Sequence, residues 1–299
     1  MDMLRISGLR KSFGTKEVLR GLELSVPEHS IFGFIGKNGA GKTTAMKTVL
    51  GFVKADEGEI TVNGEKVIYG QTATNRYIGY LPDVPEFYGF MTAPEYLRFC
   101  GEISGVSPSE TNARTEELLA LVGLAGEKHR IRGFSRGMKQ RLGIAQALLN
   151  KPKLLICDEP TSALDPVGRK EILDILLAVK EQTTVLFSTH ILSDVERICT
   201  DVAFLNNGVI EIQGKLSDIK SRLRNDEYRL ETEHAEDTAI LRQAFPFMKA
   251  VNKTTSILQE SNHRASEVLR FVAEKNISLL KWEREEPTLE SLFMEVSQK

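Results

Sequence analysis

The sequence predicts an α/β fold whose mainly parallel sheet is buried between helices, followed by a smaller α+β domain. Apolar runs at residues 30–36, 154–157 and 183–190 alternate with amphipathic segments. Such alternation is typical of parallel strands between helical layers. Beyond about residue 215 the order of strands and helices changes. We therefore expect a large domain over residues 1–215 and an accessory domain over residues 216–299.

The composition allows both domains. The chain has 299 residues, 41% hydrophobic and 27% charged, and a net charge of −2, so we expect no nucleic-acid partner. Cys100, Cys157 and Cys199 form no C-x-x-C pair, which indicates a reducing compartment and no zinc site. We expect no signal peptide, and no apolar run reaches the roughly 18–20 residues that span a bilayer. Any membrane-spanning part would belong to another chain.

The first 30 residues predict short strands joined by turns, at residues 3–13 and 18–27. A strand at residues 30–36 leads through a glycine-rich turn into a helix at about residues 41–50, which Gly51 ends. Residues 58–67 predict a β-hairpin that turns at Asn63-Gly64.

Apolar residues at helical spacing then predict a helical subdomain over about residues 86–150. A further helix at residues 168–181 and a hairpin at residues 202–214 close this domain. The accessory domain has the order strand–helix–strand–strand–helix–strand, which is typical of a ferredoxin-like unit. A last helix is expected at residues 288–298.

The glycine-rich turn carries the strongest functional signal. It matches G-x-x-x-x-G-K-[ST] in the strand–turn–helix context that the motif requires. Backbone N–H groups and the helix N-terminus would bind phosphate oxygens, Lys42 would reach the β- and γ-phosphates, and Thr43 would ligate Mg²⁺. A plain glycine-rich turn is the alternative. The expected phosphate-binding residues are Gly36, Lys37, Asn38, Gly39, Ala40, Gly41, Lys42, Thr43 and Thr44.

Two adjacent carboxylates, Asp158 and Glu159, follow the apolar run at residues 154–157. Ligands of open α/β sheets bind at the carboxyl ends of the strands. There Asp158 would bind Mg²⁺ through its water shell, and Glu159 would polarise the attacking water. His190 ends another strand at the same edge, where it would meet the γ-phosphate. The alternatives are a solvated turn for the acids and an ordinary surface or core residue for His190.

These motifs resemble the ATP-binding subunit of ABC transporters over the whole first domain. The glycine-rich turn is similar to the Walker A motif of this family, and Asp158 and Glu159 to its Walker B motif and catalytic glutamate. His190 is similar to the switch histidine, and residues 162–165 to the D-loop that lines the family's dimer interface. Phe13 falls where the family stacks an aromatic ring on adenine, although it could instead be a core residue.

Residues 133–141 resemble the signature motif of the family, Leu-Ser-Gly-Gly-Gln. Ser135 and Gly137 remain, and they would supply a hydroxyl and a closely approaching N–H group to a phosphate. The resemblance implies that they cap the γ-phosphate held by a second copy of the chain; an ordinary capped helix is the alternative. The motif is altered by Phe134 for Leu, Arg136 for the first Gly and Met138 for Gln.

A second departure lies at Asp83, where the family usually has a glutamine that touches Mg²⁺ and senses the transporter. Asp83 would still ligate Mg²⁺ through water, or it is only a turn residue between Pro82 and Pro85. The aromatic residues that follow are expected mostly in the core of the helical subdomain. Phe87, Tyr88 and Phe90 are candidates for a groove that binds a cytoplasmic helix of a membrane partner.

The resemblance implies an ATPase that uses ATP and Mg²⁺, with Glu159, His190 and Lys42 as catalytic residues. It implies a homodimer or heterodimer around two ATP molecules, bound to integral membrane permease subunits at the cytoplasmic face of the cell membrane. The end of the chain, residues 285–296, resembles a subgroup that serves drug and antibiotic-peptide exporters. The alternatives are a non-transport ABC ATPase of translation or DNA maintenance, a regulatory ATP-binding module, and a P-loop kinase or GTPase.

Overall fold

The computed structural model describes residues 1–299 except 72, 223–226, 260–263, 285–288 and 291–299. The chain divides into two compact units. Met1–Ser217 belongs to the first unit, and the second begins at Asp218.

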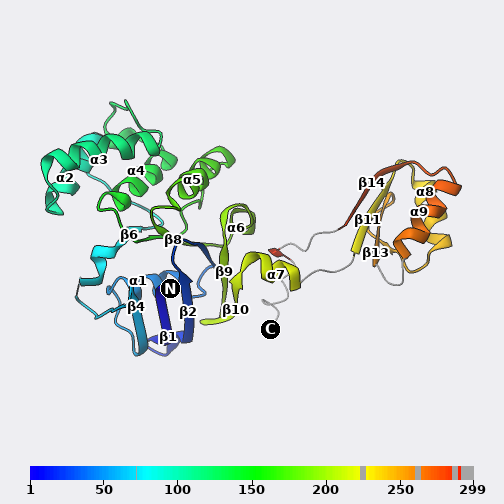
Figure 1. The fold of residues 1–299 in the computed structure, drawn as a ribbon, viewed down its shortest axis with the longest axis horizontal. Coiled ribbons are helices and arrows are strands. Elements are labelled where there is room, and N and C mark those ends of the chain that lie inside the picture. Colours follow the sequence, from blue (N-terminus) through cyan, green and yellow to red (C-terminus); the bar gives the residue numbers. More distant parts are fainter. Residues whose placement is uncertain (72, 223–226, 260–263, 285–288, 291–299) are drawn as a thin grey trace. The chain divides into compact units, whose positions relative to one another are not determined.

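A central sheet of mainly parallel strands organises the first unit (Figure 1). Its strands are β3 (Ile31–Ile35), β6 (Ile78–Leu81), β7 (Leu154–Cys157), β8 (Thr184–Thr189), β9 (Asp201–Asn206) and β10 (Val209–Lys215). Their order is β10-β9-β3-β8-β7-β6, with β9 and β10 forming an antiparallel hairpin and the other neighbours parallel. Every residue of β3, β7 and β8 is buried, as expected for strands covered on both faces.

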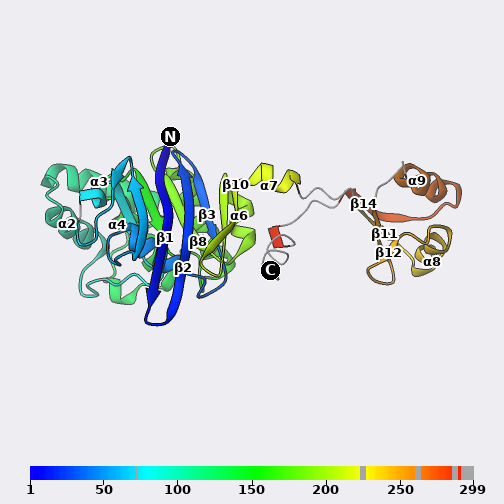
Figure 2. The same cartoon turned by 90° about the horizontal axis from the view of Figure 1, so that it is seen from below.

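An antiparallel sheet is formed by β1 (Asp2–Phe13), β2 (Lys16–Pro27), β4 (Glu57–Val62) and β5 (Glu65–Lys66), in the order β2-β1-β4-β5. The strands predicted at residues 3–13 and 18–27 are confirmed as β1 and β2, which run side by side over 12 residues each and are therefore not short (Figure 2). Their register shifts between Ile6 and Leu9, and Gly8, with φ 60°, lets the strand continue through this irregularity. The predicted β4–β5 turn is confirmed, with positive φ at Asn63 and Gly64.

The helices predicted between residues 86 and 150 are present as α2 (Ala93–Ile103), α3 (Pro108–Leu121) and α4 (Arg136–Leu148), which lie together in Figure 1. Each starts at a hydroxyl side chain. Thr92 and Glu95 form a capping box at α2, and Ser107 accepts a hydrogen bond at the start of α3. Ser135 Oγ accepts from Met138 N (3.2 Å) and begins α4.

The remaining helices of this unit connect the strands. They are α1 (Lys42–Val49), α5 (Pro166–Val179), α6 (Leu192–Ile198) and the short 3₁₀ helices at Ala73–Tyr77 and Ile131–Gly133, while α7 (Leu216–Arg222) begins in the first unit and continues into the second. Gly51, with φ 72°, ends α1 as predicted, and Phe52 N–H returns to Lys47 O at 2.9 Å. Asp165 caps α5 by accepting from Gly168 N (3.1 Å).

One hydrophobic core joins the two sheets of the first unit and encloses α1. Leu4 and Leu22 enter it from the antiparallel sheet, Phe34 and Leu186 from the central sheet, and Met46 from α1; each is at most 1% exposed. The loop between β3 and α1 is therefore fixed at both ends by packed elements.

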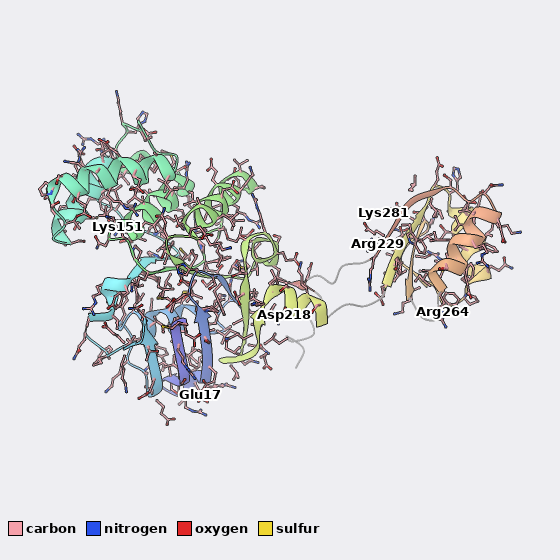
Figure 3. The ribbon with its side chains drawn as sticks, in the orientation of Figure 1. Glu17, Lys151, Asp218, Arg229, Arg264 and Lys281 are labelled. Carbon is pink, nitrogen blue, oxygen red and sulfur yellow. The ribbon has the colours of Figure 1, made fainter. Side chains whose placement is uncertain are left out.

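The second unit confirms the predicted strand–helix–strand–strand–helix–strand order. Its elements are β11 (Glu227–Thr232), α8 (Ala235–Ala244), β12 (Lys249–Ala250), β13 (Thr255–Gln259), α9 (Arg264–Glu274) and β14 (Leu279–Arg284). The sheet order β12-β13-β11-β14, antiparallel throughout, is that of a split βαβ, ferredoxin-like fold. Figure 3 labels Arg229 and Lys281 on its neighbouring strands β11 and β14. The last predicted helix, at residues 288–298, falls largely outside the described residues.

Candidate active site

The glycine-rich loop lies between β3 and the N-terminus of α1. Gly41 has a φ of 112°, and a Cβ there would lie 2.9 Å from Leu19 Cδ2. A Cβ on Gly36 would lie 2.7 Å from the carbonyl oxygen of Leu205. Both positions therefore require glycine. The first turn of α1 carries no acidic residue, so its N-terminus favours an anion.

Lys42 is buried at the start of this helix. Its Nζ donates to the carbonyl oxygens of Gly36 (2.7 Å) and Lys37 (3.3 Å) and lies 3.0 Å from Glu159 Oε1. The sequence alone could not pair Lys42 with Glu159, because the two side chains come from different strand–helix connections.

Asp158 and Glu159 follow β7 at the carboxyl edge of the central sheet. Asp158 is buried, and its Oδ2 accepts from Thr43 Oγ1 at 2.7 Å. Glu159 Oε2 lies 2.9 Å from His190 Nδ1, at the end of the adjacent strand β8. Glu159 has a φ of 48°, a conformation that is uncommon for a residue with a side chain. The structure thus brings together the predicted residues Thr43, Asp158, Glu159 and His190 at this edge of the sheet.

Lys42, Thr43, Glu159 and His190 line one cavity of about 530 Å³ at the P-loop. Phe13, at the end of β1, is 52% exposed and lines the same cavity, so it is not a core residue. Lys11 Nζ lies 5.3 Å from its ring centroid. Lys16 and Val18, which the sequence did not single out, complete the wall beside Phe13, and Ser162 lines it near Glu159.

Asp83 lines this cavity and also a second hollow beside α4. Its Oδ1 lies 3.5 Å from Arg136 and has no hydrogen-bond partner, while its backbone oxygen accepts from Gln140 Nε2 at 2.7 Å. Burial raises the pKa of the Asp83 carboxyl; Arg136 opposes this shift, whereas Asp158 and Glu159 add to it. Asp83 and Arg136, which both differ from the residues usual in ABC transporter ATPases, therefore form a charge pair with each other.

The oxygen ligands at the P-loop fit Mg²⁺. This ion retains several waters and is usually held by one or two protein oxygens together with substrate phosphates. The Thr43 hydroxyl and the Asp158 carboxylate supply such oxygens, and Asp83, whose Oδ1 accepts no hydrogen bond, lines the same cavity. Within the described part of the chain, no cluster of three or more His, Cys, Asp or Glu could hold a metal ion by itself.

Ser135 and Gly137 do not line the cavity at the P-loop. They lie at the start of α4, where a Cβ on Gly137 would be 3.9 Å from Leu164, in the loop before α5. The two segments that the resemblance assigns to a subunit interface, residues 133–141 and 162–165, are therefore neighbours in one chain.

One buried residue of the site, Ser188, was not predicted from the sequence. Ser188 Oγ donates to Asp158 Oδ1 (2.7 Å) and accepts from Glu159 N (2.9 Å). The only local signal was a small hydroxyl residue in a buried strand, two positions before His190.

A site of this construction defines a P-loop nucleoside triphosphatase. The profile of the ABC transporter family matches residues 19–162, and that of the C-terminal domain of DrrA1-3-like ATP-binding proteins matches residues 214–297. With the relatives described next, these matches show that the chain belongs to the ATP-binding proteins of ABC transporters. As a member of this family, it binds and hydrolyses ATP.

Several curated relatives extend over nearly the whole chain. The ABC transporter ATP-binding protein YxlF of Bacillus subtilis is 37% identical over 98% of this chain and 99% of its own length. The bacitracin transport ATP-binding protein BcrA of Bacillus licheniformis is 34% identical over 98% of this chain and 97% of its own length. The linearmycin resistance ATP-binding protein LnrL of Bacillus subtilis is 33% identical (99% and 98%).

Solved structures support the same fold for the first unit. An ATP-binding subunit of an ABC transporter superposes with a TM-score of 0.67 at 32% identity, over 74% of this chain and 93% of that chain. The ADP conformation of the ATP-binding cassette MJ1267 gives 0.64 at 26% identity, over 73% and 92%. In the residues that the structure describes, no helix is long and apolar enough to cross a bilayer.

Proposed function

We propose that the chain is the ATP-hydrolysing subunit of an exporter whose membrane-spanning subunits are separate chains. The observation that carries this proposal is the meeting of Lys42, Glu159 and His190 in the P-loop cavity. The cavity thereby combines a phosphate-binding helix start, a buried cation and a carboxylate base within hydrogen-bonding distance of one another.

In the proposed mechanism the P-loop amides and Lys42 bind the β- and γ-phosphates and balance their charge. Glu159 accepts a proton from the attacking water as its oxygen approaches the γ-phosphorus. The His190 contact at 2.9 Å orients the Glu159 carboxylate. Phe13 stacks on adenine, for which its exposed ring at the cavity wall is suited.

The Thr43 hydroxyl would ligate Mg²⁺, and Asp158 and Asp83 would hold it through its water shell. The ion would supply positive charge beside the transferred phosphoryl group. The short Thr43–Asp158 contact holds both oxygens at the first turn of α1, next to the amides that bind phosphate. The Arg136 partner of Asp83 limits how far that carboxylate contributes.

We further propose that two copies of the chain, or this chain and a second ATP-binding subunit, enclose two ATP molecules. The position of Ser135 and Gly137 outside their own chain's cavity supports this arrangement. They would cap the γ-phosphate bound by the other subunit, with the Ser135 hydroxyl and the α4 N-terminus as ligands.

Complementation tests this sharing of sites. A Lys42→Ala chain and a Ser135→Arg chain are each expected to be inactive as homodimers. Their mixture should recover part of the ATPase activity, because one of its two composite sites is intact. A mixture that stays inactive although heterodimers are isolated would contradict a shared site.

The membrane partner has a candidate docking groove. A hollow of about 450 Å³ is lined by Asp83, Val84 and Phe87 together with residues from the start of α4. Val84, which lines it, and Tyr88 and Phe90, which follow its lining residues Phe87 and Gly89 in the sequence, are exposed apolar side chains. We propose that a cytoplasmic helix of the permease binds here, which would place the chain peripherally at the cytoplasmic face of the cell membrane.

Co-purification tests this partner surface. A tagged chain isolated from membranes should bring its integral subunits with it, and Phe90→Ser should weaken that association without loss of folding. Ile103→Ser is a matched control, because Ile103 is also an exposed apolar residue of the helical subdomain but lies at the end of α2. Equal retention of the permease by both variants would remove the groove from the proposal.

The cargo class is proposed from the relatives. BcrA and LnrL, named for bacitracin transport and linearmycin resistance, match this chain through its C-terminal part as well. We therefore propose drugs or antibiotic peptides as exported substrates, residues 1–215 as the ATPase domain and residues 216–299 as an accessory domain. Cells that lack the chain should become more sensitive to such a compound, and Lys42→Ala should not restore resistance.

A further inference from the structure

Ser188 connects the two carboxylates of the proposed active site. Register pairs Cys157 of β7 with Phe187 of β8, so the next residues, Asp158 and Ser188, stand side by side. Ser188 is 0% exposed, donates to Asp158 Oδ1 at 2.7 Å and accepts from the Glu159 backbone N–H at 2.9 Å. A single hydroxyl thus uses its donor on one carboxylate residue and an acceptor lone pair on the next.

We infer that Ser188 is a positioning residue that orients the metal-binding carboxylate and the general base together. This inference rests on the proposed roles of Asp158 and Glu159. It assigns to β8 a second contribution to the site, in addition to His190 at its end.

The contact with Asp158 sets the direction of its carboxylate. Oδ1 is occupied by Ser188 and Oδ2 by Thr43, both at 2.7 Å. With Oδ1 held from the neighbouring strand, the plane of the group is fixed and Oδ2 faces the P-loop. Loss of the Ser188 hydroxyl would leave Oδ1 buried without a partner, and the carboxylate would be free to turn away from Thr43.

The contact with Glu159 holds an uncommon backbone conformation. Glu159 has a φ of 48°, which persists only where surrounding contacts maintain it. Its N–H donates to Ser188, and its carbonyl oxygen accepts from Ser162 N at 3.0 Å. These two bonds hold the peptide groups before and after the Glu159 Cα, and the side chain is thereby directed toward Lys42 and His190.

Three variants separate this role from simple packing. Ser188→Ala removes the hydroxyl, and Ser188→Thr retains it. Thr184→Val is the matched control, because Thr184 is a buried residue at the opposite end of β8 whose hydroxyl also accepts one backbone N–H, from His29 at 2.9 Å. All variants are made in the full chain and compared after thermal unfolding confirms that they are folded.

The first measurement is equilibrium Mn²⁺ binding in the presence of ADP, followed by the electron paramagnetic resonance of free Mn²⁺. Loss of a residue that orients a metal ligand typically weakens metal binding by about 10–100-fold. We expect a loss in this range for Ser188→Ala, and near-normal affinity for Ser188→Thr and Thr184→Val. A merely structural role would make Ser188→Ala and Thr184→Val alike.

The second measurement is kcat at saturating metal. Ser188→Ala should lower kcat in the wild-type background. It should lower it little further in Glu159→Gln, because a base that is already absent cannot be displaced. If Ser188→Ala lowers kcat by the same factor in both backgrounds, Ser188 does not act through Glu159, and that half of the inference is overturned.

Asp158→Asn and Thr43→Ala distinguish the failure of this inference from failure of the proposed site. If neither changes Mn²⁺ affinity, the metal assignment is wrong and the role of Ser188 falls with it. If both weaken binding while Ser188→Ala matches Thr184→Val, the metal site stands and Ser188 is only a packed residue. If Ser188→Thr binds Mn²⁺ as weakly as Ser188→Ala, side-chain shape rather than the hydroxyl is responsible, and the inference is overturned.

Discussion

Replacement of Glu159 by glutamine removes one negative charge and keeps the shape of the side chain. Glu159 Oε1 lies 3.0 Å from Lys42 Nζ, and Oε2 lies 2.9 Å from His190 Nδ1. The amide cannot accept the proton of the attacking water. We therefore expect kcat to fall by about 10²–10⁴-fold, the range for a positioned base, which corresponds to roughly 3–5 kcal/mol of activation free energy.

The same change has a smaller effect on stability. At an effective dielectric of about 20, the attraction of Lys42 and Glu159 at 3.0 Å is about 5–6 kcal/mol before desolvation is subtracted. Lys42 keeps its bonds to the carbonyl oxygens of Gly36 and Lys37, and the new amide oxygen can still accept from it. We expect a net loss of about 1–3 kcal/mol in the free energy of unfolding of the first unit.

Phosphate release and ATP binding are measured side by side on the purified chain, with chemical unfolding in parallel. Glu110→Gln is the matched control, since Glu110 pairs with Lys151 at 2.9 Å on the exposed surface. It should leave kcat unchanged and alter stability by less than about 1 kcal/mol. Turnover within a few-fold of wild type in Glu159→Gln, with normal ATP binding, would refute the assignment of Glu159 as the base.

Three further perturbations test other parts of the molecule. In a fluorescent-nucleotide titration, Phe13→Ala should weaken ATP binding by about 1–3 kcal/mol, the loss expected for a base–aromatic stack, while Phe13→Tyr should preserve the affinity. Equal ATP affinities of Phe13→Ala and the wild type would exclude stacking. Gly79→Ala should destabilise the first unit by at least about 1–3 kcal/mol in chemical unfolding, because its Cβ would lie 2.2 Å from Ala147 O, and a wild-type midpoint would contradict this packing. The pKa of Asp83 is raised in the folded chain, so ionisation of this carboxyl opposes folding. The free energy of unfolding of the wild type, relative to that of Asp83→Asn, should therefore increase as pH falls from about 7 toward 4. A difference that stays constant or decreases would contradict the direction of the pKa shift.

Features encoded by neighbouring residues were predictable from the sequence. The P-loop, the buried strand before Asp158, the capped start of α4 and the Asn63-Gly64 turn each lie within a short segment whose residue types determine the local backbone. The strand–helix order of the second unit was predictable for the same reason, since its hydrophobic periodicity changes with each element.

Features that depend on which segments become neighbours were not predictable. The role of Ser188 requires that β7 and β8 pair in one particular register, and the Asp83–Arg136 pair requires that α4 pack beside the end of β6. The shift in the β1–β2 register near Gly8 is likewise not revealed by the alternation of residue types. Tertiary contacts, rather than local propensity, determine each of these features.

The strand order of the second unit has a mechanical consequence. Its first and last strands, β11 and β14, are adjacent and antiparallel, and Tyr228 near the start of β11 pairs with Arg284 at the end of β14. A force that pulls on the two connecting segments therefore separates this ladder from its open end, one hydrogen-bonded pair after another, instead of shearing all pairs at once. This geometry favours unfolding by peeling, which would start at the Tyr228–Arg284 end of the ladder.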